Sequence, residues 1–183
     1  MTSPVAASEN DIGYRPVADR PAWPMRHSIR LRGFDYGQSG AYFITICVLN
    51  RERLLGQVET DAVRLTGAGR MILETWNDLP RHSPLHVDTV VIMPDHMHGI
   101  VMLTEVAQKR VTLSDVVRRF KSTTTVAYCR GVAQNGWRPF SGHLWQRNYH
   151  ERIIRDEQEL DHIREYILNN PTRYAQRESP PRP

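Results

Sequence analysis

The sequence predicts an α+β domain in which helices pack on an antiparallel sheet. Segments rich in β-branched and aromatic residues alternate with segments whose apolar residues recur at helical spacing. Two apolar segments also flank the turn signal Pro94-Asp95, and this arrangement predicts a β-hairpin. With 183 residues the chain has about the length of one domain, so it can bury a core without disulfide bonds.

Each predicted element has its own signal. Residues 41–48 are β-branched and aromatic, which favours a strand. Thr112 followed by Asp115 resembles a capping box and predicts a helix start. In order along the chain, we expect a strand at 41–48, a helix at 66–80, hairpin strands at about 86–93 and 96–103, a helix from Thr112 to about Ala127, a short extended piece at 142–147, and a last helix from about Asp156 that ends at Asn169-Asn170-Pro171.

This order of elements is the ferredoxin-like split βαβ pattern. It has one antiparallel sheet with two helices on one face, followed here by a C-terminal helix. We expect the domain to span residues 26–171, with residues 1–25 as a flexible arm and residues 172–183 as a disordered tail. Because unrelated proteins share this fold, function has to be inferred from the residues of a site.

The composition limits the classes of partner. The formal net charge is +4, and Lys109 and Lys121 are the only lysines. Arginine binds phosphate oxygens in pairs and stacks on bases, which favours a nucleic-acid partner. A GC-rich coding sequence would also enrich arginine, and both interpretations stay open. Only two cysteines occur, Cys47 and Cys129, with no secretory leader and no apolar segment of about 20 residues, so we expect a cytoplasmic protein without a membrane partner.

His96 and His98 are the first candidate site residues. They begin the second strand of the predicted hairpin, and side chains two positions apart on a strand point to the same face. Two neutral imidazoles on a rigid strand suit a divalent metal ion. Two surface histidines at a strand start would give the same short pattern, so the pair alone does not decide the function.

Tyr149 is the candidate nucleophile. We expect it to begin a short helical stretch in which Ile153 and Ile154 dock on the core. A tyrosine hydroxyl titrates at about 10, so it needs assistance to attack at neutral pH. A metal ion supplies such assistance by polarising a phosphate and neutralising charge in the transition state. An interfacial ring with its hydroxyl in water is the alternative for Tyr149.

Six short segments together resemble a known family. They are RLRGFDY at 30–36, GAYFITIC at 40–47, MPDHMHG at 93–99, VRRFKS at 117–122, LWQRNY at 144–149 and REYILNNP at 164–171. In this order and spacing, the chain resembles the one-tyrosine HUH transposases that act on single-stranded DNA. The resemblance is to the REP-associated tyrosine transposases in particular, and it covers about residues 27–173.

The resemblance implies a ferredoxin-like sheet, a metal pair at His96 and His98 that holds Mg²⁺ or Mn²⁺, and a nucleophile at Tyr149. That tyrosine would cut DNA to leave a 5′-phosphotyrosine and a free 3′-hydroxyl, so the strand can be rejoined without ATP. Members of this branch recognise short palindromic hairpins with a flanking single-stranded tag, and they usually act as monomers. We therefore expect this protein to bind single-stranded and hairpin DNA. We also expect it to act as a monomer rather than as a dimer.

The chain departs from the family pattern at Arg152, where many members have a histidine three residues after the tyrosine. Arginine cannot ligate a metal ion, although it could clamp a phosphate. His150 and Glu151 are the adjacent candidates for a third ligand or for assistance. If the departure removes catalysis, the chain would be a domesticated protein that binds DNA hairpins without cutting them.

Further basic residues are candidates for DNA contact. Arg119 and Lys121 lie on the polar side of the helix that starts at Thr112, and they could follow a DNA backbone. For Arg118, an ordinary solvated helix face is the preferred interpretation. Two other classes are disfavoured. A zinc hydrolase lacks its H-x-H-x-D signature because position 100 is Ile, and in an RNA-binding module aromatic residues would stand on the strand face where the histidines lie.

Overall fold

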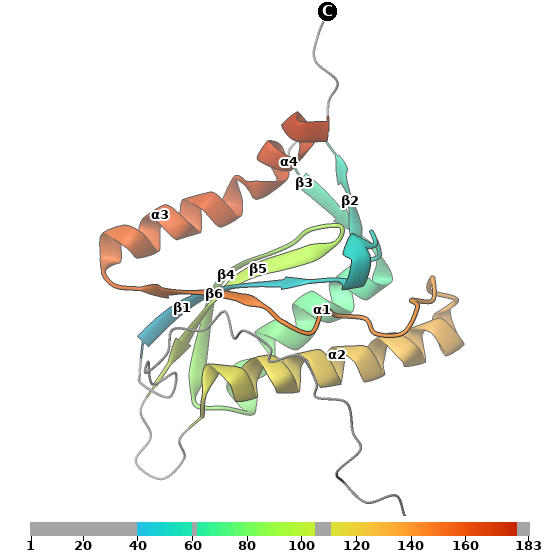
Figure 1. Cartoon of the computed structure of the whole chain (residues 1–183), viewed down its shortest axis with the longest axis horizontal. Coiled ribbons are helices and arrows are strands. Elements are labelled where there is room, and N and C mark those ends of the chain that lie inside the picture. The colour runs from blue at the N-terminus through green and yellow to red at the C-terminus, as the bar shows by residue number, and fades with distance from the viewer. Residues whose placement is uncertain (1–39, 60–61, 105–110, 179–183) are drawn as a thin grey trace, which may run out of the picture. The chain divides into compact units, whose positions relative to one another are not determined.

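The computed structural model describes residues 40–59, 62–104 and 111–178 (Figure 1). The expected N-terminal arm and the segment at 30–36 lie outside the described residues. Within the described part, no helix is long and apolar enough to cross a membrane.

Four strands form the main sheet: β1 (Gly40–Cys47), β4 (Leu85–Ile92), β5 (His96–Leu103) and β6 (His150–Ile154). Their order is β4-β5-β1-β6, and each neighbouring pair is antiparallel. The two strand pairs that a helix connects, β1 with β4 and β5 with β6, each have a third strand between them. This order confirms the predicted ferredoxin-like arrangement.

Helices α1 (Gly67–Asn77) and α2 (Leu113–Asn135) cover one face of the sheet. The Thr66 side chain caps α1, and Thr112 and Asp115 form the predicted capping box at the start of α2. Trp76 and Phe120 meet edge to face beneath the sheet, with ring centroids 5.7 Å apart. This face therefore carries the larger apolar core and stiffens the strands from below.

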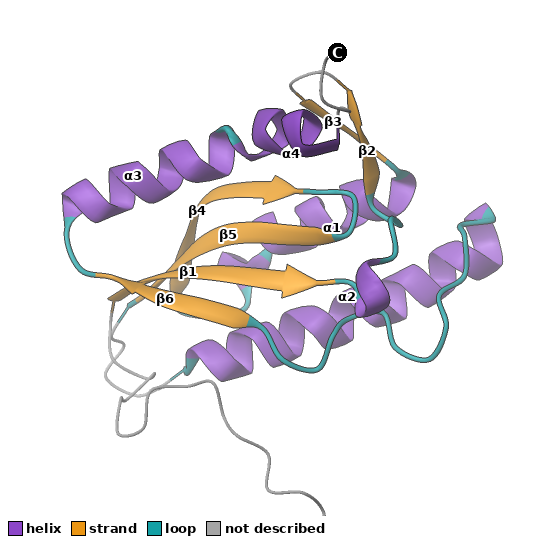
Figure 2. Cartoon of the chain, turned by 45° about the horizontal axis from the view of Figure 1, so that its top comes forward, coloured by secondary structure: helices purple, strands orange, loops and turns teal. Residues whose placement is uncertain are grey.

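The other face is covered by α3 (Glu157–Leu168), and α4 (Asn170–Glu178) continues from it (Figure 2). Leu160, Ile163 and Ile167 of α3 pack on Ile100 of β5 and form a second, smaller cluster. The two clusters lie on opposite faces because successive residues of a strand alternate between faces. The predicted stripe of the last helix is thus confirmed.

Two short 3-10 helices and a small hairpin complete the fold. They are η2 (Leu49–Arg51), η3 (Leu79–Arg81), β2 (Gly56–Glu59) and β3 (Ala62–Leu65). None of them was predicted, because each is too short to show a period in the sequence.

Three predictions about the C-terminal part of the chain are wrong. The last strand of the sheet is β6, whereas residues 142–147 contribute only an isolated bridge between Val48 and Trp145. The expected helical stretch from Tyr149 is that strand, because β-branched Ile153 and Ile154 suit the sheet edge beside β1. The tail expected from residue 172 is also helical up to Glu178, since proline is compatible with the first turn of a helix and Pro171 lets α4 begin where α3 ends.

Candidate active site

The histidine pair lies on the sheet face covered by α3 and α4. His96 and His98 are 8% and 6% exposed, and their Nε2 atoms are 3.2 Å apart. Two ligands at right angles around an ion with bonds of about 2.1 Å lie about 3 Å apart. The structure therefore confirms that the two side chains project together, at a separation that fits neighbouring ligands of one metal ion.

The other ring nitrogens of the pair are held by the protein. Nδ1 of His96 donates to Oδ1 of Asp95 at 2.5 Å, because a carboxylate only accepts. Nδ1 of His98 is hydrogen bonded to the Thr45 hydroxyl at 2.8 Å. With its proton on Nδ1, His96 directs the lone pair of Nε2 at His98. The two Nε2 atoms repel each other unless a proton or a metal ion lies between them. The pair is therefore chemically suited to binding a metal ion.

Burial sets the charge of this pair. Burial, reinforced by the positive charges of His96 and Arg51, lowers the pKa of His98 to about 3, so this ring is neutral near pH 7. Burial would raise the pKa of Asp95, but the hydrogen bond from His96 and the charges of His96 and Arg51 bring it below its usual value. A neutral imidazole is the form in which histidine binds a metal ion, and His98 is in this form.

Tyr166 is the aromatic residue that α3 brings to the histidines. Its ring centroid is 5.5 Å from that of His98, and Phe43 packs against both rings at 6.0 Å and 5.4 Å. The guanidinium of Arg173 lies 5.6 Å from the Tyr166 centroid. Contacts with His98, Phe43 and Arg173 thus hold the Tyr166 ring next to the histidine pair.

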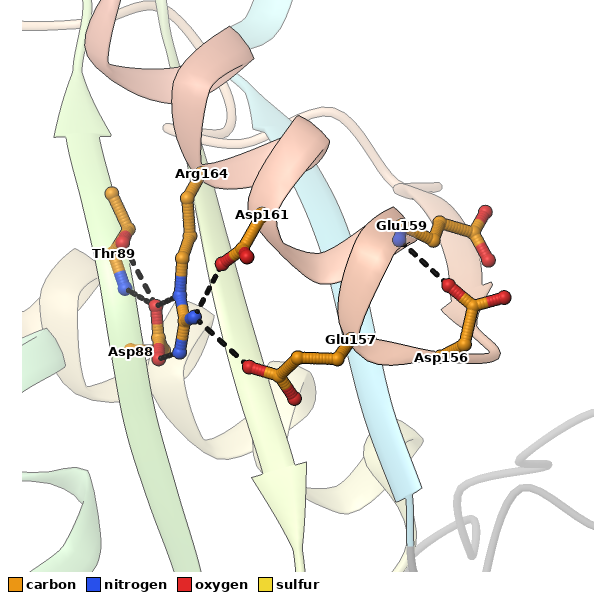
Figure 3. Close-up of polar contacts among 7 residues, drawn as sticks. All are labelled: Asp88, Thr89, Asp156, Glu157, Glu159, Asp161 and Arg164. Carbon is orange, nitrogen blue, oxygen red and sulfur yellow. Dashed lines mark hydrogen bonds and ion pairs between the residues drawn. The ribbon is translucent and has the colours of Figure 1, made fainter.

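An ion pair fixes α3, and with it Tyr166, on the sheet. Arg164 donates from Nε and NH2 to the two carboxylate oxygens of Asp88 at 3.1 and 2.7 Å (Figure 3). Asp88 also accepts from the amide and hydroxyl of Thr89, at a break in the β4–β5 register. The hydrogen bonds from Arg164 hold the pKa of Asp88 well below its usual value. A bidentate pair of this kind restricts both sliding and rotation of the helix.

Helix α4 closes a pocket of about 270 Å³ over the histidine pair. Asn170 is 8% exposed and lies four residues after Tyr166. The ring of Tyr174 is 6.5 Å from that of His96. The lining residues are Thr45, Arg51, Asp95, His96, His98, Tyr166, Asn170, Arg173, Tyr174 and Arg177. The segment expected to be a disordered tail therefore supplies three side chains to the pocket.

Tyr149, the expected nucleophile, lies on the opposite face of the sheet. It is 9% exposed in the α1–α2 cluster, and Nζ of Lys121 is 5.6 Å from its ring centroid. The residue precedes His150, which pairs with Thr45 on the histidine face, so strand alternation turns Tyr149 away. The structure does not bring this tyrosine to His96 and His98.

The residues expected to assist are also dispersed. His150 lies on the histidine face beside Thr45 but is exposed and does not line the pocket. Glu151 pairs with Ile44, whose side chain is in the α1–α2 cluster, so it lies on the wrong face to be a ligand. Arg152 forms an ion pair with Glu159 at 2.5 Å and joins β6 to α3. Among the described residues, no three His, Cys, Asp or Glu side chains form a metal-binding group.

The two cations expected to contact DNA differ in their surroundings. Nζ of Lys121 donates to the carbonyl oxygens of Gln146, Arg147 and Asn148 at 2.8, 3.2 and 3.2 Å, and burial lowers its pKa to about 8. The ammonium group of Lys121 therefore holds the segment before β6 in place. This placement does not fit the expected contact of Lys121 with DNA. Arg119 is exposed and makes one long bond of 3.4 Å to the carbonyl of His82.

The sequence contains a signal for the residues that were missed. Tyr166, Asn170 and Tyr174 recur every four residues and so continue one helical side beside the buried stripe of α3. Asn169-Asn170-Pro171 conceals this period because it is also a stop signal. Arg51 carries no periodic signal, since its position depends on a turn.

The site thus consists of two histidines on one face of the sheet and a tyrosine on the helix that covers this face. The model of the family "Transposase IS200 like" matches residues 40–170, and the chain belongs to this family. The resemblance drawn from the sequence motifs is thereby confirmed, and the chain is a transposase of this kind.

Three further proteins are similar to this chain. An uncharacterized protein of Haemophilus influenzae is 36% identical in an alignment of 170 residues that covers 82% of this chain and 91% of that protein. A second protein of the same organism, whose name assigns it provisionally to the REP-associated tyrosine transposases, is 24% identical over 77% of this chain and 75% of its own length. A solved REP-associated tyrosine transposase bound to a REP hairpin matches with a TM-score of 0.59 and 24% identity, over 82% of this chain and 74% of that chain, and shows the same fold.

Proposed function

We propose that this transposase cuts and rejoins single-stranded or hairpin DNA, with Tyr166 as the nucleophile. The observation that carries the proposal is the 5.5 Å separation of the Tyr166 and His98 rings on one face of the sheet. Tyr174 lines the same pocket, but its ring lies farther from the nearer histidine, at 6.5 Å. Tyr166 is also held by the Arg164–Asp88 pair two residues earlier on α3.

The proposed step exchanges one phosphoester for another. The phenol oxygen of Tyr166 attacks the phosphorus, and the bond to the 3′ oxygen breaks as the bond to tyrosine forms. The phenol gives up its proton and the leaving 3′ oxygen takes one up, while the strand on the 3′ side of the cut stays attached through its 5′ phosphate as a phosphotyrosine. Attack by a 3′-hydroxyl on this ester reverses the step and joins strands, so no nucleotide cofactor is required.

His96, His98 and Asn170 would hold a Mg²⁺ or Mn²⁺ ion. The two Nε2 atoms are suitably spaced, and the amide oxygen of Asn170 is a ligand type that hard cations accept. Asn170 replaces His150 and Glu151, which lie outside the pocket. When bound, the ion would polarise the scissile phosphate and offset the charge that develops on it.

Hairpins of short palindromic repeats are the proposed substrate. The family assignment supports this substrate, as do the name of one relative and the REP hairpin held by the structural neighbour. We propose a monomer as the active species in the cytoplasm. The histidine pair and Tyr166 come from one chain, so the site is assembled without a partner subunit.

A catalytically inactive hairpin-binding protein is the second candidate function. The sequence suggests this function because Arg152 stands where many family members have a histidine. Because Arg152 pairs with Glu159 away from the pocket, this departure leaves the residues of the proposed site intact. The structure therefore gives less reason for loss of catalysis than the sequence does.

A covalent-trapping experiment tests the proposed function. A hairpin oligonucleotide from the DNA that flanks the gene, labelled at its 3′ end, is incubated with Mn²⁺ and analysed for a labelled protein band. We expect the wild type and Tyr149→Phe to form this band and Tyr166→Phe to lose it while still binding the hairpin. Loss of the band in Tyr149→Phe with its retention in Tyr166→Phe would overturn the assignment. No band from folded wild-type protein would favour the binding-only function.

A further inference from the structure

We propose that Arg51 is a catalytic residue whose guanidinium binds the non-bridging oxygens of the phosphate attacked by Tyr166. The inference rests on the proposed function and adds a residue from a turn outside the histidine and tyrosine motifs. Arg51 lines the pocket together with the histidine pair. Four observations about its turn and its neighbours carry the argument.

The backbone at Arg51 is in an unfavourable conformation. Asn50 and Arg51 have φ angles of 55° and 56°, and they are the only non-glycine residues with positive φ among those described. Asparagine enters the left-handed region with little difficulty because its short side chain can bond locally, whereas arginine has no such compensation. Strained residues of this kind concentrate at functional sites, where the surrounding structure imposes them.

The surrounding structure does impose this conformation. The amide of Val48 donates to the carbonyl of Asp95 at 2.9 Å, and the amide of Leu55 donates to the carbonyl of Pro94 at 3.0 Å. Leu55 is fully buried, which fixes the far end of the turn. Both ends of segment 48–55 are therefore tied to the turn that precedes His96, and Arg51 lies between them.

An ion pair orients the Arg51 side chain. NH1 of Arg51 is 3.6 Å from Oδ2 of Asp95, whose other oxygen accepts from His96. The arginine side chain is still 52% exposed, and an exposed ion pair at this distance contributes little to stability. The pair thus directs the guanidinium beside the histidines without accounting for the strain of its backbone.

The charge of the pocket fits an anionic ligand. Three arginines line it, Arg51, Arg173 and Arg177, and Asp95 is its only acidic lining residue. Arg173 lies over the Tyr166 ring, while Arg51 is linked through Asp95 to His96 itself. The forked guanidinium matches two oxygens of one phosphate, which favours Arg51 as the group that holds the reacting phosphodiester.

The test compares two substrates with the same sequence. One hairpin oligonucleotide carries a phosphodiester at the bond that the wild type cuts, and the other carries an uncharged methylphosphonate there. On the phosphodiester we expect Arg51→Gln to lower kcat by about 100-fold to 1,000-fold, with little change in KM because the contact strengthens in the transition state. On the methylphosphonate the two proteins should cut at similar rates, because the charge that Arg51 binds is absent.

Two controls separate this role from a structural one. Arg70→Gln removes an exposed arginine of α1 outside the pocket and should leave both rates unchanged. Titration with Mn²⁺ alone should give Arg51→Gln the wild-type affinity, since Asp95 and His96 remain in place. A weaker Mn²⁺ affinity that matches the lost rate would overturn the inference, as would an equal loss on both substrates. A wild type that cuts neither substrate would overturn the proposed function as well.

Discussion

Asp95 should control how tightly the histidine pair binds a metal ion. Its carboxylate accepts from Nδ1 of His96 at 2.5 Å, and both residues are 8% exposed. The bond fixes the tautomer that leaves Nε2 free to act as a ligand. Asp95→Ala removes the acceptor, so the His96 ring can rotate and can also carry its proton on the wrong nitrogen.

The structure allows two substitutions to be ranked. A hydrogen bond to a charged group contributes about 1.5–3 kcal/mol, and a neutral one about 0.5–1.5 kcal/mol. The Asp95–His96 bond is of the first type, and the Thr45–His98 bond at 2.8 Å is of the second. We therefore expect Asp95→Ala to weaken Mn²⁺ binding about 10-fold to 100-fold, and Thr45→Val to weaken it less.

Isothermal titration of the whole chain with Mn²⁺ measures both effects without any DNA. Asp95→Asn serves as an intermediate control, because its amide oxygen can still accept from His96 but carries no full charge. An unchanged Mn²⁺ affinity in Asp95→Ala, or a larger loss in Thr45→Val, would refute the reasoning about the carboxylate.

Three other changes have defined outcomes. The pKa of Asp88 is lowered in the folded chain, so its stabilising effect is fully present above about pH 4 and is lost as the pH falls through the folded pKa. Thermal melts of wild type and Asp88→Asn should differ near pH 7 and converge in acid, and a constant difference would argue against the Arg164 pair. Lys121→Met should lower the free energy of unfolding in urea by about 1–3 kcal/mol, because three carbonyls lose their donor, and should leave the salt dependence of hairpin binding unchanged. Arg119→Gln should reduce the slope of log affinity against log salt by about one unit if Arg119 contacts a phosphate, and an identical slope would identify a solvated face.

Most of the fold could be predicted because its long elements have clear periods. The hairpin of β4 and β5, the stripe of α3 and the capping box of α2 were each predicted at or close to their observed positions. The strand β6 was misplaced because a short edge strand of five residues has too few positions to distinguish it from a helical turn.

The candidate site could be predicted only in part. His96 and His98 come together because strand alternation is a local rule that the sequence displays. The choice between Tyr149 and Tyr166 depends on which face of the sheet each element covers, and this is a tertiary property. Asn170 was treated as a stop signal, although it also begins α4 and lines the pocket.

The location of the covalent bond tests the central claim most directly. Trypsin cleaves after arginine and so places Tyr149, Tyr166 and Tyr174 in separate peptides. These peptides are residues 148–152, 165–173 and 174–177. The wild type is trapped on a hairpin oligonucleotide, the DNA is trimmed with nuclease, and the tryptic peptides are analysed by mass spectrometry. We predict that the nucleotide remnant is carried by Tyr166 in peptide 165–173. A remnant on Tyr149 in peptide 148–152 would contradict the account, because that residue lies on the opposite face of the sheet from the histidine pair.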